Sequence, residues 1–138
     1  MTTDEPVKKD PGCVAVIVTS RGEILLHLRD EKPDICWPGY WSLLGGGQEL
    51  GESWMDTVLR EIEEEAGITP DTIEEAAVVP HGSEKNPPHV FYGTWDGRES
   101  DLVLGEGQAL RLFPLDKLPE KVPPHIRHYI RQLTAAVS

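Results

Sequence analysis

The sequence predicts one mixed α/β domain in which a central sheet is flanked by two helices. Three observations support this prediction. The length of 138 residues suits a single compact domain, short apolar runs bounded by turn residues recur along the chain, and two segments carry apolar residues at helical spacing. Residues 1–11 are polar and bounded by proline, so we expect a loose tail before a domain that spans residues 12–138.

The first strands are expected close to the start of this domain. Cys13–Thr19 is almost continuously apolar and rich in valine, which is typical of a strand covered on both faces. Arg21 and Gly22 form a turn, and Glu23–Arg29 has the pattern of a second strand. The two segments are therefore predicted to form a hairpin.

A loop and a short strand follow the hairpin. Asp30–Tyr40 contains Pro33, Pro38 and Gly39, which favour a loop. Trp41–Leu44 is predicted to be a short strand that runs into three consecutive glycines.

Ser53–Ala66 has the strongest helical periodicity in the chain. Met55, Val58, Leu59, Ile62 and Ala66 fall within one apolar stripe, so this helix is expected to pack on a core. Ser53 can cap its amino terminus with Asp56 three positions on, and Gly67 supplies a stop at its carboxyl terminus.

The second half of the chain is predicted to complete the sheet and add another helix. Strands are expected at Ala76–Pro80, Val90–Trp95 and Ala109–Phe113. Pro124 opens a final helix that runs through Val137, with Ile126, Tyr129, Ile130 and Leu133 on one face.

The charge balance restricts the classes of partner. The chain has 13 basic and 24 acidic side chains and a formal net charge of −11, which repels nucleic-acid backbones and anionic lipid. No apolar run approaches the ~18 residues of a membrane span, and the first residues lack the apolar core of a signal peptide. Cys13 and Cys36 belong to no CxxC pair, so we expect reduced thiols. These features predict a soluble cytoplasmic protein with neither a nucleic-acid polymer nor a membrane as partner.

Three carboxylates cluster along one side of the predicted helix Ser53–Ala66. At about 100° per residue, Glu64 lies about 300° and Glu65 about 40° around the helix from Glu61. Like charges at such spacings destabilise a helix, and Mg²⁺ or Mn²⁺ would compensate them because both prefer oxygen ligands. The alternative is a solvated acidic face in which Arg60 pairs with Glu64, and the helix alone leaves both interpretations open.

The segment upstream of the helix changes this balance. Gly45, Gly46 and Gly47 let the main chain turn tightly and approach a ligand closely. From Gly46 the chain runs through five residues to Glu52 and seven more to Arg60-Glu61-Ile62, followed by Glu64-Glu65 and Gly67-Ile68. This spacing matches the Nudix box in full, so the chain resembles the Nudix family, and the strand pattern extends the resemblance over most of residues 12–135. Leu44 is one departure, because many members have proline before the paired glycines.

The resemblance implies a Nudix α/β/α sandwich with a central mixed β-sheet. It also implies hydrolysis of a nucleoside diphosphate linked to another moiety, with Mg²⁺ or Mn²⁺ as cofactor. The site residues that the resemblance implies divide by role. The metal ligands are Gly45, Glu52, Glu61, Glu64 and Glu65, and Gly46 and Gly47 contact the substrate. Arg60 orients the catalytic glutamates, and Glu61 is the expected general base, with Glu64 or Glu65 as alternatives.

Gly105-Glu106-Gly107-Gln108 resembles the Glu-Gly-Gln segment of MutT-type pyrophosphohydrolases. The resemblance implies an additional metal ligand at Glu106, whereas the alternative is an ordinary loop carboxylate. It favours a nucleoside triphosphate, including a noncanonical or oxidised one, as the substrate. A nucleotide sugar is the second hypothesis. A non-catalytic Nudix-fold binding module is the third, although such modules often lose box carboxylates and none is missing in this chain.

Aromatic and histidine residues outside the box give weaker signals. We expect Trp37 and Tyr40 to line the pocket mouth, where they can stack on a nucleobase, and Trp41 to pack under the sheet. His125 and His128 are expected at the surface of the last helix. The sequence does not decide the roles of His81, His89 and the loop 30–40, and it leaves a homodimer open.

Overall fold

The computed structural model describes residues 12–35, 37–82 and 86–135 of the chain. Seven strands, two helices and one 3-10 turn follow one another in these ranges. They are β1 (Cys13–Val18), β2 (Glu23–Leu28), β3 (Trp41–Ser42), β4 (Leu44–Gly46), α1 (Trp54–Ala66), β5 (Thr72–Glu75), β6 (His89–Thr94), η1 (Glu99–Asp101), β7 (Ala109–Pro114) and α2 (Pro124–Thr134). In the same described ranges, no helix is both long and apolar enough to span a bilayer.

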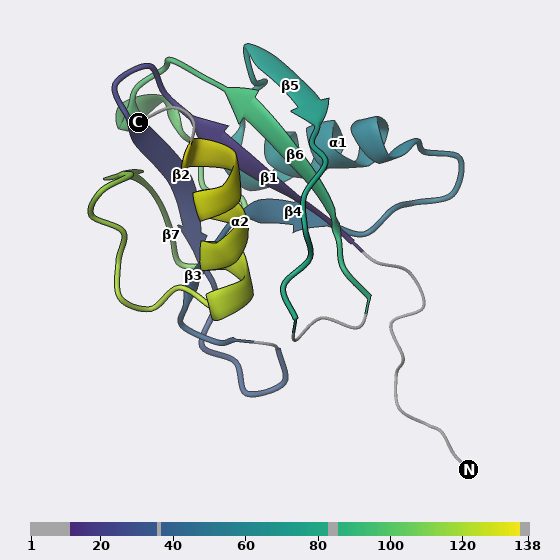
Figure 1. Cartoon of the computed structure of the whole chain (residues 1–138), viewed down its shortest axis with the longest axis horizontal. Helices are drawn as coiled ribbons and strands as arrows, with labels where there is room; N and C mark the ends of the chain where they lie inside the picture. Colours follow the sequence, from purple (N-terminus) through teal and green to yellow (C-terminus); the bar gives the residue numbers. More distant parts are fainter. Residues whose placement is uncertain (1–11, 36, 83–85, 136–138) are drawn as a thin grey trace.

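The seven strands form one mixed sheet. Its main path runs β3-β2-β1-β6-β5, while β4 pairs with β1 and β7 pairs with β2. The pairing of β1 with β6 is parallel, with Val14 opposite Val90, and the other pairings are antiparallel. Figure 1 shows β1 in the middle of the sheet. The central strand is therefore apolar at nearly every position, as the continuous run Cys13–Thr19 predicts.

The two helices cover opposite faces of this sheet (Figure 1). Alternate residues of β1 point to the two sides: Ala15 and Ile17 pack in the cluster that includes α1, whereas Val16 and Val18 pack in the cluster that includes α2. The predicted α/β/α sandwich with a central mixed sheet is confirmed. The α1 side matters most for the site, because β4 lies beneath that helix and His27 of β2 lines the same cavity as its carboxylates.

One predicted strand is wrong. The segment Ala76–Pro80 is not a strand, and β5 lies just before it at Thr72–Glu75, paired antiparallel with β6. The backbone of Val79 bonds instead to α2, because its N–H donates to the side-chain oxygen of Gln132 and its carbonyl accepts from the Gln132 amide. Side chains of a helix thus satisfy backbone groups that a sheet would otherwise pair.

Smaller differences concern element boundaries. The predicted strand Trp41–Leu44 divides at Leu43, because β3 pairs with β2 whereas β4 pairs with β1. The helix α2 is described through Thr134, and the predicted end at Val137 lies outside the described residues, as does Cys36. Cys13 is a buried free thiol, and burial raises its pKa to about 11.

Candidate functional site

The helix α1 is fixed in position by its caps and its apolar stripe. The Ser53 hydroxyl accepts from the backbone N–H of Asp56 at 3.0 Å, and the Asp56 carboxylate accepts from the backbone N–H of Ser53 at 3.1 Å. Gly67 ends the helix in the left-handed conformation. Val58 and Ile62 are fully buried against the sheet. The carboxylates one position away from this stripe are therefore held next to β4.

Glycines let β4 run directly beneath these carboxylates. The N–H of Gly45 donates to Glu65 Oε1 at 3.1 Å. A Cβ atom on Gly46 would overlap the Glu61 carboxylate, and a Cβ atom on Gly45 would overlap the carbonyl of Cys13. Glycine at position 46 thus allows the close approach of β4 to α1, and glycine at position 45 allows the close approach of β4 to β1.

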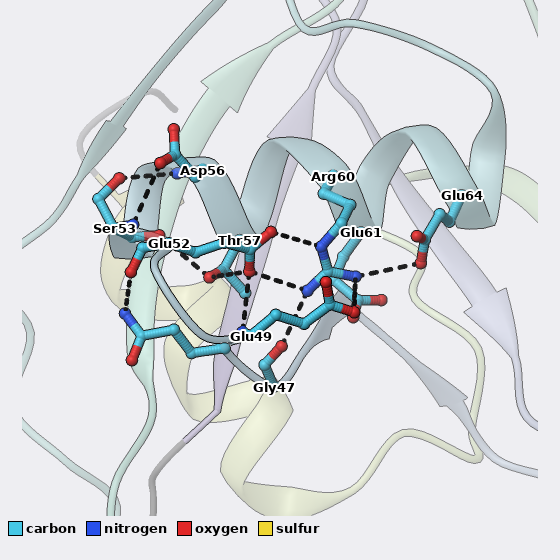
Figure 2. Close-up of polar contacts among 10 residues, drawn as sticks. Gly47, Glu49, Glu52, Ser53, Asp56, Thr57, Arg60, Glu61 and Glu64 are labelled. Carbon is cyan, nitrogen blue, oxygen red and sulfur yellow. Dashed lines mark hydrogen bonds and ion pairs between the residues drawn. The ribbon is translucent and has the colours of Figure 1, made fainter.

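Arg60 is the centre of the polar network on α1 (Figure 2). Its Nε donates to Glu52 Oε2 at 2.6 Å, and its Nη2 donates to Glu52 Oε1 at 3.1 Å and to the Gly47 carbonyl at 3.0 Å. Its Nη1 lies 3.2 Å from Glu61 Oε2 and 3.3 Å from Glu64 Oε1. One guanidinium therefore connects the helix entrance, the glycine turn and two of the three clustered carboxylates.

The network also fixes the charge of Glu52. The hydrogen bond from Arg60 is the largest of several interactions that lower the pKa of Glu52 to about 2. Thr57 Oγ1 and the backbone N–H of Glu49 both donate to Glu52 Oε1 at 2.9 Å. With these donors in place, Glu52 stays ionised and forms a bidentate ion pair with Arg60. This geometry assigns Glu52 a supporting position behind Arg60.

Glu61 and Glu65 have the opposite electrostatic environment. Burial raises the pKa of Glu65 to about 8, the amide of Gly45 opposes that shift, and the charges of Glu61 and Glu106 add to it. Burial also raises the pKa of Glu61, against the effect of Arg60. The two carboxyl groups hydrogen bond to each other. A buried acid and a half-buried acid that are hydrogen bonded to each other can bind a cation in exchange for a proton.

Glu106 enters the same site on a loop that is held at both ends. On one side, the N–H of Gly105 donates to the Glu65 carbonyl at 3.0 Å, and a Cβ atom on Gly105 would overlap the Glu64 carbonyl. On the other side, the N–H of Gln108 donates to the Leu28 carbonyl and its Nε2 to the Arg29 carbonyl, both at 2.8 Å. The loop therefore bridges α1 and β2.

These groups line one cavity of about 670 Å³. Seven residues expected at the site from the sequence meet there: Gly45, Gly46, Arg60, Glu61, Glu64, Glu65 and Glu106. Glu52 and Gly47 do not line the cavity, and both contact it through Arg60. The predicted pair of Arg60 with Glu64 is present together with the carboxylate cluster. The structure thus combines the two interpretations of the acidic face.

The aromatic side chains expected at the pocket mouth lie elsewhere. Trp37 and Tyr40 pack edge to face with ring centroids 5.0 Å apart, and Trp37 lies 6.2 Å from the ring of His125 on α2. Neither residue lines the carboxylate cavity. Trp41 packs edge to face on Phe113 in the core on the α2 side.

The remaining histidines also lie outside this cavity. His89 Nδ1 lies 2.6 Å from Glu75 Oε2, which accepts from it, and the His89 ring stacks on Trp54. His81 and His128 make an edge-to-face contact near α2.

Sequence reasoning missed five polar side chains that line the cavity: His27, Arg29, Asp30, Lys32 and Glu49. Arg29 and Lys32 add positive charge to a cavity that is otherwise rich in carboxylates. The sequence contained a signal for His27, because it is the one polar residue of the strand segment Glu23–Leu28 after Glu23. Burial lowers the pKa of His27, and the charge of Arg29 adds to this effect.

The donor set of the cavity fits a hard divalent cation. Its carboxylates supply oxygen ligands of the kind that Mg²⁺ and Mn²⁺ prefer, and desolvation raises the pKa of Glu61 and Glu65, so a cation would stabilise the ionised form of both. Among the described residues, however, no three His, Cys, Asp or Glu side chains are already arranged to hold a metal ion. Arg60 binds Glu61 and Glu64 in this structure, so a cation would compete with its guanidinium for those oxygens.

Comparison with known protein families identifies the arrangement. A family model described as the NUDIX domain matches residues 8–133, which include the glycine strand, α1 and the Glu106 loop. The chain belongs to the Nudix family. The prediction made from the box is thereby confirmed, and the departure at Leu44 does not remove the chain from the family.

Individual Nudix proteins give the same result. The chain is 33% identical over 89 residues to a Nudix hydrolase of Listeria innocua, covering 64% of this chain and 52% of that protein. It is 28% identical over 88 residues to an RNA pyrophosphohydrolase of Erythrobacter litoralis, covering 62% of this chain and 52% of that protein. The chain thus spans about half the length of these relatives.

Solved structures match over nearly the whole Nudix fold. The MutT NUDIX hydrolase of Burkholderia pseudomallei superposes with a TM-score of 0.67 and 32% identity, covering 91% of this chain and 98% of that structure. The MutT protein of Methanosarcina mazei superposes with a TM-score of 0.68 and 26% identity, covering 96% and 99%.

Proposed function

We propose that this Nudix protein is a metal-dependent pyrophosphohydrolase that cleaves a nucleoside diphosphate linked to another moiety. The observation that carries the proposal is the single cavity into which α1, the glycine strand β4 and the Glu106 loop bring four carboxylates. Partial burial of Glu61 beside the buried Glu65 destabilises the ionised form of both. A substrate carried with a divalent cation supplies the missing positive charge.

The residues divide into a metal-binding side and a phosphate-binding side. Glu61, Glu64, Glu65 and Glu106 would hold Mg²⁺ or Mn²⁺, with the Gly45 carbonyl as a further oxygen ligand. The bound cation would neutralise phosphoryl charge and lower the pKa of a coordinated water. On the other side, Arg29 and Lys32 line the same cavity and would bind phosphoryl oxygens. This division accounts for anion binding by a chain whose net charge is −11.

Glu61 is our choice for the general base. It would take a proton from the attacking water while the bridging P–O bond between the α and β phosphoryl groups breaks, which gives a nucleoside monophosphate and pyrophosphate from a triphosphate. Burial raises the pKa of Glu61 toward the working pH, which suits a base. Arg60 keeps Glu61 and Glu64 aligned, and Glu52 in turn keeps Arg60 aligned. Glu64 and Glu65 remain the alternative bases.

A nucleoside triphosphate, including a noncanonical or oxidised one, is the proposed substrate. The support is the position of Glu106, because the Glu-Gly-Gln segment delivers its carboxylate to the same cavity as the box glutamates. The Erythrobacter relative named as an RNA pyrophosphohydrolase also acts on a phosphoanhydride, according to its name. A nucleotide sugar is the alternative substrate, since the carboxylate cavity addresses the phosphates and not the group attached to them.

A substrate panel with product analysis tests the proposal. The protein is incubated with Mg²⁺ or Mn²⁺ at mildly alkaline pH and with nucleoside triphosphates, nucleotide sugars, dinucleoside polyphosphates or nicotinamide dinucleotides. Phosphorus NMR then identifies the products. We expect a nucleoside monophosphate and pyrophosphate from at least one triphosphate. Cleavage confined to nucleotide sugars selects the alternative substrate, and absence of turnover with every compound favours a non-catalytic binding module.

A further inference from the structure

His27 lies at the end of β2 on the face of the sheet that α1 covers. Along β2, Leu25 packs in the apolar cluster beneath α1, and His27 follows two positions later on the same face. Its cross-strand neighbours are Ser42 on β3 and Leu110 on β7. The side chain is 8% exposed and lines the carboxylate cavity. A buried imidazole therefore forms part of the cavity wall.

The two ring nitrogens of His27 have different surroundings. Nδ1 is buried without a hydrogen-bond partner, and it is the one side-chain nitrogen or oxygen in that condition within the described ranges. The Nε2–Cδ2 edge faces the main chain of Gly107, because a Cβ atom on Gly107 would lie 3.0 Å from Nε2 and 2.8 Å from Cδ2. Gly107 also lines the cavity. One nitrogen thus points into the protein and the other lies at the cavity edge.

This asymmetry selects one neutral tautomer. A proton on Nδ1 would be a buried donor without an acceptor, which is rarer in proteins than an unsatisfied acceptor. The ring therefore places its proton on Nε2 and leaves a lone pair on Nδ1. In this form the histidine offers the cavity an N–H donor that carries no charge. No hydrogen bond from Nε2 to a described protein group is found, so water or a ligand can accept from it.

We propose that His27 contacts the substrate and donates Nε2–H to a phosphoryl oxygen of the bound polyphosphate. Phosphoryl oxygens accept hydrogen bonds and cannot donate them, which matches a site that offers only a donor. Arg29, two residues further along the same chain, lines the cavity with Lys32 and would bind neighbouring oxygens. His27 adds hydrogen bonding at the cavity wall without adding charge beside the carboxylates. This inference rests on the proposed function, because it assumes that a phosphate chain occupies the cavity.

Two substitutions of His27 separate the effect of its hydrogen-bond donor from the effect of its packing. In His27→Gln the side-chain amide keeps an N–H donor near the position of Nε2, whereas His27→Leu fills the site without a donor. The probe is inorganic pyrophosphate with Mg²⁺, titrated by calorimetry into each folded variant. We expect His27→Leu to weaken pyrophosphate binding by about tenfold or more, as loss of a hydrogen bond to a charged group does. His27→Gln should stay within about threefold of the wild type.

The wild-type protein supplies a second test if His27→Leu does not fold. Long-range ¹H–¹⁵N spectra of protein labelled at histidine report which nitrogen carries the proton. We expect a proton on Nε2 of His27 and a shift of that resonance when pyrophosphate and Mg²⁺ are added. A proton on Nδ1, an unshifted resonance, or equal pyrophosphate affinity of His27→Leu and the wild type would overturn the proposal.

The outcomes distinguish failure of the His27 proposal from failure of the proposed hydrolase function. If the wild type turns over a substrate and His27→Leu has the same KM and kcat, the contact of His27 with substrate is contradicted and the hydrolase function is supported. If the wild type hydrolyses no member of the substrate panel but His27→Leu binds pyrophosphate more weakly than the wild type, the phosphate contact of His27 is supported and the hydrolase function is contradicted. A shifted resonance with a free nucleoside, but not with pyrophosphate, assigns His27 to the base or sugar and contradicts a phosphate contact.

Discussion

The two helices of this Nudix domain perform the same structural task and carry opposite surfaces. Each buries an apolar stripe on one face of the sheet. Outside that stripe, α1 carries five acidic residues: Asp56, Glu61, Glu63, Glu64 and Glu65. The described part of α2 carries no acidic residue, and its charged or titratable side chains are His125, Arg127, His128 and Arg131. Apolar residues thus determine where both helices lie, and the other residues determine which one forms a site.

The surroundings of the helices sharpen this contrast. Over α1, glycines in β4 and in the Glu106 loop bring backbone against the carboxylates. Beside α2 there is a cavity of about 490 Å³ lined by His81, Pro124, Arg127, His128, Arg131 and Gln132. The carboxylates that a divalent cation requires are absent from that lining. We therefore expect substitutions in the core beneath α2 to change stability and substitutions of the α1 carboxylates that line the cavity to change activity.

The largest expected effect is on stability and comes from the core beneath α2. Ile130 is 1% exposed and packs in the apolar cluster on that side. Ile130→Ala should lower the free energy of unfolding by about 2–5 kcal/mol, because it removes buried methyl groups and leaves a cavity. Urea unfolding measures the loss, and kcat measured well below the new melting temperature should equal that of the wild type. A kcat that falls in the folded variant would break the contrast between the helices.

The next largest effect is on metal affinity and comes from α1. The double variant Glu64→Gln/Glu65→Gln should bind Mn²⁺ at least about tenfold more weakly, which is the loss expected from removing even an outer-shell partner. Calorimetric titration measures the affinity. The double variant Glu63→Gln/Glu74→Gln makes the same two chemical changes at exposed positions and should bind as the wild type does. Equal affinities in all three proteins would remove Glu64 and Glu65 from the metal site.

A pH dependence follows from Glu65. Its pKa is about 8 in the folded protein, above the ordinary value of 4.5, so the folded state holds a proton that the unfolded state loses first. With metal chelated, the free energy of unfolding should fall as pH rises from about 4.5 to about 8, by at most about 1.4 kcal/mol per pH unit for one proton. Glu65→Gln should reduce this slope. Urea unfolding at several pH values tests it, and parallel curves for the two proteins would contradict the assignment.

The smallest effect is expected at the outer side of α2. Arg131 lines the cavity beside that helix and not the carboxylate cavity. Arg131→Gln should leave kcat/KM within about twofold and the free energy of unfolding within about 0.5 kcal/mol of the wild type, as is usual for a surface substitution. A steady-state assay and urea unfolding check both values. A larger loss of activity would extend the functional surface to α2.

Local patterns made most of the fold and the α1 carboxylates predictable. Arg60, Glu61, Glu64 and Glu65 are placed by helix geometry alone, and the caps at Ser53 and Gly67 follow from neighbouring residues. The resemblance to the Nudix box then connected that helix with its glycine turn. These features need no knowledge of contacts between distant parts of the chain.

Distant contacts explain what the sequence did not predict. His27 and Arg29 reach the cavity because β2 pairs with β7 and because Gln108 bonds to the end of β2. Neither contact has a signal in the local sequence. The wrong strand at Ala76–Pro80 has the same origin, since side chains of α2 bond to the backbone of Val79. The loop that carries Trp37 turns toward His125 on α2, and no pattern within the loop indicates that direction.

Comparison of Glu61→Gln with Glu63→Gln tests the central claim most directly. The two residues lie two positions apart on α1, but Glu61 lines the cavity whereas Glu63 is exposed outside it. With Mg²⁺ and the best substrate of the panel, we predict that Glu61→Gln lowers kcat by at least about 10²-fold, as loss of a general base does. Glu63→Gln should retain the wild-type rate. Equal rates in the two variants would contradict a catalytic role for the carboxylates in the α1 cavity.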